Sequence, residues 1–149
     1  MLRVERLPGR PEDGIEAVLL LVVPSDLGLL DEAVDCFVAL CVEGGEPTPS
    51  TRFRLRSAIA EAVSNAIARG NESNPSKAVA VRAELRERHV RVSVSDEGLG
   101  FDPDTVPDPC EPEARERPCG RGLLIIRHLA DHVAFNAKGN TIWMTLPRW

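Results

Sequence analysis

The sequence predicts an α+β fold, a two-layer sandwich in which a mixed, mostly antiparallel sheet carries helices on one face. Two observations predict it. Pairs of stretches with alternating apolar and polar residues are joined by short polar links, as in antiparallel hairpins. Three other stretches repeat apolar residues at helical spacing. The length of 149 residues is typical of one domain. We therefore expect a single domain over residues 1–149 and not a doubly wound parallel sheet.

The first half of the chain predicts one strand and two helices. Residues 1–14 are polar with two prolines, and we expect an irregular lead-in. Residues 15–23 predict a strand that ends at Pro24, because proline donates no ladder hydrogen bond. Ser25 and Asp26 are capping residues for a helix to about residue 43. A second helix begins at Ser50 or Thr51 and continues to about Arg69.

The second half predicts two hairpins separated by a long loop and a third helix. Residues 79–85 and 90–95 alternate in polarity and form the first hairpin. Residues 98–119 are rich in proline and charge without apolar periodicity, and long loops inside compact domains are usually functional. A helix over about 122–132 follows, and residues 133–136 and 141–146 form the second hairpin.

Composition and charge narrow the function classes. The hydrophobic fraction of 43% and charged fraction of 28% are those of a globular protein. The net charge is −5 and no basic stripe is present, which argues against direct binding of nucleic acid. The longest apolar run, residues 17–23, is too short to span a membrane. The first residues show no long apolar region and no cleavage site, so we expect a cytoplasmic protein.

The four cysteines predict neither a zinc site nor a disulfide framework. None forms a Cys-x-x-Cys pair, and the three histidines are not spaced with them as zinc ligands usually are. We expect reduced structural thiols, with a bond between Cys110 and Cys119 in the long loop as the alternative under oxidation.

Asp96 ends the first predicted hairpin and begins the motif Asp96-Glu-Gly98-Leu-Gly100. Because side chains alternate along a strand, Asp96 shares the core-facing side of the valines at 90, 92 and 94. A carboxylate there needs a donor, and the exocyclic amine of adenine can supply one, whereas guanine presents a carbonyl oxygen. Gly98 and Gly100 would let the backbone turn and approach a flat base. A plain turn after a strand is the alternative.

Two more motifs place polar groups on the predicted helices. Glu61 and Asn65 are one turn apart and share a face, where an amide oxygen suits Mg²⁺ and a carboxylate can accept a proton. Gly120 and Gly122 open the third helix, whose N-terminal N–H groups and dipole favour phosphate, and Arg121 can add a charged contact. Taken singly, a solvated helix face and an ordinary loop before a helix are the alternatives.

Together, the three motifs resemble those of the GHKL, or Bergerat-fold, ATPases over about residues 50–146. The shared pattern is Glu-x-x-x-Asn on a helix, Asp-x-Gly-x-Gly after a strand, a long loop, and Gly-x-Gly-Leu on a helix. Within this superfamily the chain resembles the small stand-alone anti-sigma-factor serine kinases. The phrases that carry this likeness are Asn65-Ala-Ile-Ala-Arg-Gly-Asn, Asn74-Pro-Ser-Lys and Gly122-Leu-Leu-Ile-Ile.

The resemblance implies that ATP and Mg²⁺ are the cofactors, and it implies roles for individual residues. Glu61 would be the general base on a partner serine, Asn65 would hold Mg²⁺ and Asp96 would read adenine. Residues 101–119 would form the ATP lid. The remaining expected nucleotide contacts are Arg69, where these kinases often have histidine; Gly98 and Gly100 in the base pocket; Gly120, Arg121, Gly122 and Leu123 around the phosphates; and Thr141 beside the adenine.

The function implied is an ATP-dependent serine protein kinase that acts as an anti-sigma factor in a partner-switching pathway. Its partners would be a sigma factor or similar regulator and an antagonist protein that it phosphorylates on serine, and it would form a homodimer. A nucleotide-gated module that sequesters its partner without phosphoryl transfer is the alternative, because Glu61 alone argues for transfer. The catalytic half of a split histidine kinase is a weaker alternative, since no histidine precedes His89.

Overall fold

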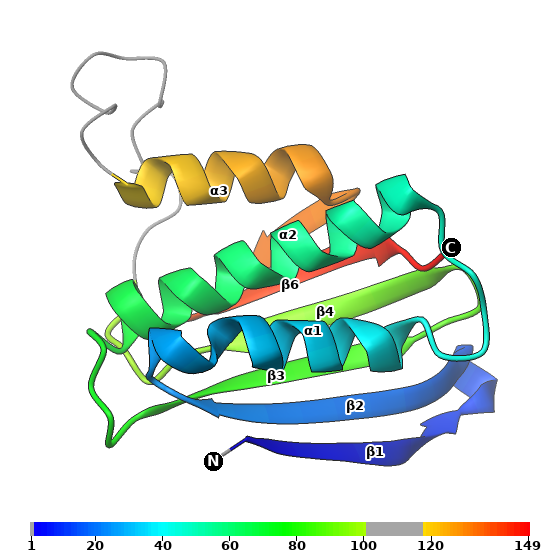
Figure 1. Cartoon of the computed structure of the whole chain (residues 1–149), viewed down its shortest axis with the longest axis horizontal. Coiled ribbons are helices and arrows are strands. Elements are labelled where there is room, and N and C mark those ends of the chain that lie inside the picture. Colours follow the sequence, from blue (N-terminus) through cyan, green and yellow to red (C-terminus); the bar gives the residue numbers. More distant parts are fainter. Residues whose placement is uncertain (1, 101–117) are drawn as a thin grey trace.

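The computed structural model describes residues 2–100 and 118–149 and has two layers (Figure 1). Six strands form one sheet in the order β1-β2-β3-β4-β6-β5, and all five pairings are antiparallel. Helices α1, α2 and α3 lie on one face of it, which confirms the predicted α+β class. The strands are β1 (Arg3–Arg10), β2 (Ile15–Pro24), β3 (Ala78–Leu85), β4 (His89–Ser95), β5 (His132–Phe135) and β6 (Thr141–Pro147); the helices are α1 (Leu30–Cys41), α2 (Pro49–Asn65) and α3 (Pro118–Leu129).

The core lies between the sheet and the helices. Along β2, Leu21 is 1% exposed whereas its neighbour Val22 is 41% exposed, as the alternation of side chains requires. From the helix layer, Phe37 of α1 and Ile59 of α2 are fully buried against the strands. Burial of this apolar surface is the main stabilising term for such a fold.

Both predicted hairpins are present. In the first, β3 and β4 pair with Val81 opposite Val94. In the second, β5 pairs with β6, and β6 also pairs with β4, with Ser95 opposite Thr141. This last pairing brings the end of β4 next to the turn between β5 and β6. The sheet therefore delivers Asp96, the residue after β4, to that turn.

The prediction of an irregular lead-in over residues 1–14 is wrong. Residues 3–10 form β1 at the edge of the sheet, and a 3-10 turn over Pro11–Asp13 leads into β2. The sequence hides this strand because it has only a weak alternation and contains Pro8. Charged residues and proline are what exposed edge strands tolerate, since one side of such a strand makes no ladder bonds.

The helices are present with shifted boundaries. A 3-10 turn at Leu27–Leu29 precedes α1, and the Asp26 side chain accepts a hydrogen bond from Gly28 N at 2.8 Å, as its capping role predicts. Helix α2 begins at Pro49 and continues at its end into a π-helical turn over Ala66–Gly70. Helix α3 begins at Pro118, four residues before the predicted start at Gly122. Proline fits the first turn of a helix, because the N–H it lacks would have no partner there.

Arg148 connects the end of the chain to the opposite half of the sheet. The residue is 5% exposed, and its guanidinium donates to the carbonyl oxygens of Cys41 at 2.8 Å and Arg86 at 2.9 Å. It also forms an ion pair with Glu16 at 2.6 Å. Burial raises the pKa of the Cys41 thiol to about 12, against the opposing charge of Arg148. Cys41 is therefore a structural thiol, as predicted.

Of the predicted ATP lid, residues 101–117, with Cys110, lie outside the described residues, and the last two residues of the predicted range begin α3. Within the described ranges, no helix is long and apolar enough to cross a membrane.

Candidate functional site

The predicted site residues gather where α2 ends and α3 begins (Figure 1). Three segments far apart in the sequence meet there: residues 61–71 on α2 and its π-helical turn, residues 96–100 after β4, and residues 122–123 on α3. The turn between β5 and β6 borders these segments, because its residue Lys138 lies against Gly100. Two clusters result, one around Asp96 and one around Glu61 and Asn65.

The Asp96 carboxylate lies half-buried against the π-helical turn that follows α2. It accepts a hydrogen bond from Gly98 N at 2.8 Å. A Cβ atom built at Gly70 would lie only 2.6 Å from Asp96 Oδ1 and nearer still to the other carboxyl atoms. Only a glycine at position 70 therefore allows the carboxylate this position. Gly70 is a site residue that the sequence analysis did not single out.

Burial raises the pKa of Asp96 above its ordinary value. The Gly98 N–H and the positive charges of Lys138 and Lys77 act in the opposite direction, and the effect of burial is larger than theirs. A half-buried carboxylate that accepts one hydrogen bond from the described part of the chain can still accept others, so a ligand that donates a hydrogen bond would stabilise its charged form.

The two glycines after Asp96 allow close backbone contacts. A Cβ at Gly98 would lie 2.8 Å from the carbonyl carbon of Gly70 and 2.9 Å from Asp96 Oδ1. Gly100 has φ +84°, and a Cβ there would lie 2.8 Å from the carbonyl carbon of Lys138 in the β5–β6 turn. These positions need glycine both for its small size and, at Gly100, for its left-handed backbone.

Glu61 and Asn65 lie half-buried on the side of α2 that contacts α3. A Cβ built at Gly122 would lie 2.7 Å from Asn65 Nδ2 and 3.2 Å from Glu61 Oε2. Gly122 therefore lets the first turns of α3 approach the polar pair closely. The next residue, Leu123, is buried. Gly122 lies inside the helix and not at its start as predicted. Its contribution to the site is therefore that it has no side chain at this contact.

The other predicted nucleotide contacts lie around these two clusters. Gly120 and Arg121 belong to the first turn of α3, where the N–H groups have no partner within the helix. Arg69 is exposed on the π-helical turn. Thr141 is half-buried at the start of β6, with its hydroxyl 2.8 Å from Ser95 Oγ, next to Asp96 in the chain.

Two asparagines near Asp96 escaped the sequence analysis as site residues. Asn71 is 0% exposed and accepts a hydrogen bond from Glu97 N, and Asn140 donates one to the carbonyl oxygen of Asp96. For Asn71 the available signal was its place directly after Gly70 at the end of a helix. For Asn140 it was its place directly before Thr141, one of the predicted nucleotide contacts.

An adenine nucleotide with Mg²⁺ fits these donors and acceptors. The Asp96 carboxylate can accept a hydrogen bond from an amine, and the backbone at Gly70 and Gly98 leaves no side chain over it. Asn65 and Glu61 offer the oxygen atoms that Mg²⁺ prefers. The described residues contain no cluster of three or more His, Cys, Asp or Glu side chains that could hold a metal. Mg²⁺ often keeps waters and phosphate oxygens as its other ligands, so it needs few ligands from the protein.

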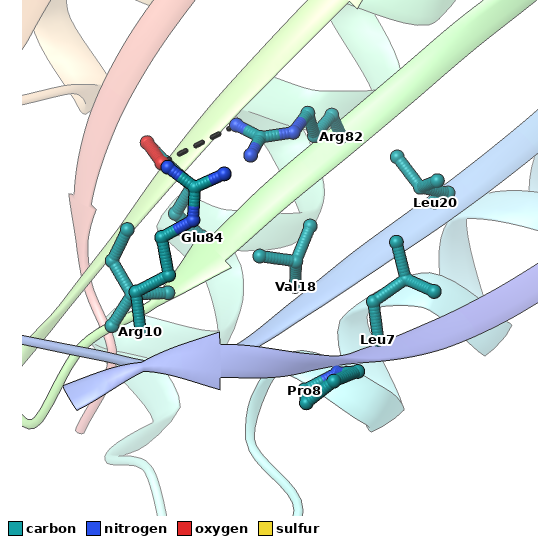
Figure 2. Close-up of a pocket in the computed structure, with 8 residues that line it drawn as sticks. Leu7, Pro8, Arg10, Val18, Leu20, Arg82 and Glu84 are labelled. Carbon is teal, nitrogen blue, oxygen red and sulfur yellow. Dashed lines mark ion pairs between the residues drawn. The ribbon is translucent and has the colours of Figure 1, made fainter.

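A cavity of about 180 Å³ lies elsewhere, between β1, β2 and β3 (Figure 2). Val18 and Leu20 contribute apolar atoms to it, and Arg82 forms an ion pair of 3.3 Å with Glu84 beside them. These residues alternate along their strands with the core residues, so they lie on the sheet face opposite the helices. None of the predicted nucleotide contacts lines this cavity.

Comparison with known proteins shows the family of the chain. The sequence pattern of the histidine kinase-like ATPase domain matches residues 23–146, from the end of β2 to β6. The anti-sigma F factor of Bacillus cytotoxicus is 31% identical over 115 residues, which cover 72% of this chain and 77% of that protein. The anti-sigma F factor of Clostridium beijerinckii is 30% identical over 113 residues, which cover 72% and 75%. The chain therefore belongs to the histidine kinase-like ATPase family, in the GHKL group that contains the anti-sigma-factor kinases.

Proposed function

We propose that this chain is an ATP- and Mg²⁺-dependent serine protein kinase that acts as an anti-sigma factor in the cytoplasm. The observation that carries the proposal is the paired geometry of the site. The half-buried Asp96 carboxylate faces Gly70 and Gly98, and the Glu61–Asn65 pair faces the first turns of α3. One cluster suits the base of the nucleotide and the other suits its phosphates and the acceptor hydroxyl.

In this proposal Asp96 selects adenine. Its carboxylate accepts a hydrogen bond from the exocyclic amine, which a guanine or hypoxanthine base replaces with a carbonyl oxygen. Gly98 and Gly100 let the segment after Asp96 pack against Gly70 and the β5–β6 turn, and Thr141 would lie beside the base. Because burial already raises the pKa of Asp96, a bound amine that donates to the carboxylate relieves part of the cost of its charge.

The phosphates would lie between α2 and α3. The free N–H groups in the first turn of α3, which holds Gly120 and Arg121, favour negative charge, and Gly122 would leave room beside them. Arg69 can add a contact from the end of α2. Asn65 Oδ1 would be the protein ligand of Mg²⁺, which neutralises phosphate charge when bound.

Phosphoryl transfer would use Glu61 as the general base. The serine hydroxyl oxygen of the substrate protein forms a bond to the γ-phosphorus of ATP, and the bond from that phosphorus to the bridging oxygen breaks, leaving ADP. The serine proton passes to the Glu61 carboxylate. Most of the acceleration in such reactions comes from positioning and charge stabilisation, and the site supplies both with few groups.

The partners in this proposal follow from the relatives. These proteins carry the name anti-sigma F factor, and we infer that this chain also binds a sigma factor or similar regulator. The serine substrate would be a small antagonist protein, and the kinase would be a homodimer. A nucleotide-gated module that binds its partner without transfer remains the second candidate, because it would need the same Asp96 cluster without any use of Glu61.

Thermal unfolding with nucleotides tests the binding part of the proposal. ATP with Mg²⁺ at 100 times its Kd should stabilise the fold by about 2.7 kcal/mol, which raises the melting temperature by about 5–10 °C for a domain of this size. GTP should give no shift. Equal shifts with both nucleotides, or none with ATP, would contradict the role of Asp96. Incubation with γ-labelled ATP and a candidate antagonist protein then separates a kinase from a binding module, since the latter leaves all protein unlabelled.

A further inference from the structure

The backbone around Asp96 is held from two sides by asparagine side chains. One is Asn71, on the segment that follows α2, and the other is Asn140, at the end of the β5–β6 turn. Of these two described side chains, neither forms a hydrogen bond with the Asp96 carboxylate. Both bind main-chain atoms directly beside it, at sequence separations of 26 and 44 residues.

Asn71 uses every part of its amide. Its Oδ1 accepts from Glu97 N at 2.7 Å, and its Nδ2 donates to Ser25 Oγ and to the Ala78 carbonyl oxygen, both at 3.0 Å. Its own N–H donates to the carbonyl oxygen of Ala66 at 2.8 Å. The amide orientation is fixed by these partners, because a flipped amide would set its NH₂ group against the Glu97 N–H. The side chain thus joins the end of the α2 segment to the residue after Asp96.

Asn140 holds Asp96 from the other side. Its Nδ2 donates to the Asp96 carbonyl oxygen at 3.1 Å, and its own carbonyl oxygen accepts from Asp96 N at 2.9 Å. Asn140 is itself fixed, because its Oδ1 accepts from Asn136 Nδ2 at 2.7 Å. The turn that carries Asn140 also contacts Gly100 through Lys138, so it borders the same cluster.

We propose that Asn71 and Asn140 are positioning residues that fix the Asp96 carboxylate for discrimination between purine bases. The inference rests on the proposed adenine-reading role of Asp96. Among the described residues the carboxylate accepts one hydrogen bond, from Gly98 N, and that bond lies within the same short segment. The direction of the carboxylate therefore depends on how firmly residues 96 and 97 are held, and the two asparagines hold them from two different elements.

Fixing the position of the carboxylate should affect the ratio of ATP to ITP affinity more than it affects the affinity for ATP itself. A carboxylate that cannot move away must face the carbonyl oxygen of a guanine or hypoxanthine base, which is repulsive. A carboxylate that can rotate or retreat lowers this penalty and also weakens the bond to the adenine amine. Loss of either asparagine should therefore reduce the preference for adenine.

The test measures the affinity for ATP and for ITP, which carries a carbonyl in place of the amine, by equilibrium titration of the full chain. The variants are Asn71→Ala and Asn140→Ala. The matched control is Ser25→Ala, which removes one partner of Asn71 Nδ2 and leaves the bond to Glu97 N in place. The melting temperature without nucleotide is measured for each variant.

We expect each asparagine variant to reduce the ratio of ATP to ITP affinity about tenfold, the effect of losing about one hydrogen bond's worth of positioning, whereas Ser25→Ala keeps the wild-type ratio. A merely structural role would lower the melting temperature and leave that ratio unchanged. An unchanged ratio in both folded asparagine variants overturns the proposal.

A second measurement does not depend on the folding of any variant. In the wild-type protein, the Glu97 amide should exchange with solvent slowly, because it donates to a fully buried side chain. Exchange at the rate of an open loop overturns the role of Asn71. Failure of the proposed function has a different signature, since the wild-type protein would then bind ATP no better than ITP while the Glu97 amide stayed protected.

Discussion

The contact between Gly70 and Asp96 predicts that Gly70→Ala separates nucleotide affinity from stability. The new Cβ would lie 2.6 Å from Asp96 Oδ1 and nearer still to the other two carboxyl atoms, so the carboxylate must retreat by more than about 1 Å to reach an ordinary contact distance. A displacement of that size misaligns a charged hydrogen bond worth about 1.5–3 kcal/mol. We therefore expect ATP affinity to fall roughly 10- to 150-fold.

The stability of the same variant should change less than its affinity for ATP, because two effects on the free energy of unfolding oppose each other. Position 70 ends a helical turn, where alanine is favoured over glycine by about 0.5–1 kcal/mol. The strain of the added methyl group, about 1–3 kcal/mol in a packed site, offsets this gain. The net loss in the free energy of unfolding should stay below about 2.5 kcal/mol.

Isothermal titration with ATP and urea denaturation of the same samples measure the two quantities. Gly44→Ala is the matched control, because Gly44 has φ +87° and nothing lies within 4 Å of a Cβ there. That variant should lose about 1–2 kcal/mol of stability from backbone strain and keep its ATP affinity. Wild-type ATP affinity in Gly70→Ala would refute the placement of the nucleotide over Asp96.

Three further predictions concern other residues. Glu61→Ala should abolish transfer of labelled phosphate to the antagonist and leave ATP affinity nearly unchanged; transfer at the normal rate would exclude Glu61 as the base. Asp96→Asn should remove the ATP-induced rise in melting temperature. Burial raises the pKa of Asp96 in the folded state, so its charge destabilises the nucleotide-free protein above that pKa. In urea denaturation at pH 7, Asp96→Asn should therefore be more stable than the wild-type protein. This difference should disappear as the pH falls through the raised pKa. Arg148→Met leaves two main-chain carbonyl oxygens without their donor and should cost roughly 2–4 kcal/mol in urea denaturation, whereas Arg91→Met, at an exposed arginine stacked on an aromatic ring, should cost less than about 1 kcal/mol. Equal losses for the two arginines would contradict the structural role of the buried one.

Most of the sheet could be predicted because its signal is local. The valines of β3 and β4 alternate with polar residues, and a short link joins the two strands, so the pairing of Val81 with Val94 follows from the sequence. The edge strand β1 could not be predicted in this way, because Pro8 and its charged neighbours give no clear alternation. The start of α3 was misplaced because glycines suggested a helix start, whereas Pro118 begins the helix.

The polar residues of the site could be predicted from the sequence, but the residues that hold them in place could not. Asp96, Glu61 and Asn65 stand out because their chemistry and spacing form a pattern. Gly70 and Asn71 acquire their roles only through contacts with a strand end about 26 residues away, and no property of the local sequence reports such a contact. The role of such residues depends on tertiary contacts, so it can be recognised only in the folded structure, where the segments lie side by side.

The pairing of β4 with β6 has a consequence for the order of folding. Ser95 and Thr141, whose hydroxyls meet at 2.8 Å, are 46 residues apart in the chain. Contacts across such a long loop form late, after local helices and hairpins, which close in microseconds or less. Refolding chains should therefore recover their helical circular dichroism signal before they can bind a nucleotide. The appearance of ATP binding would then show that β6 has paired with β4.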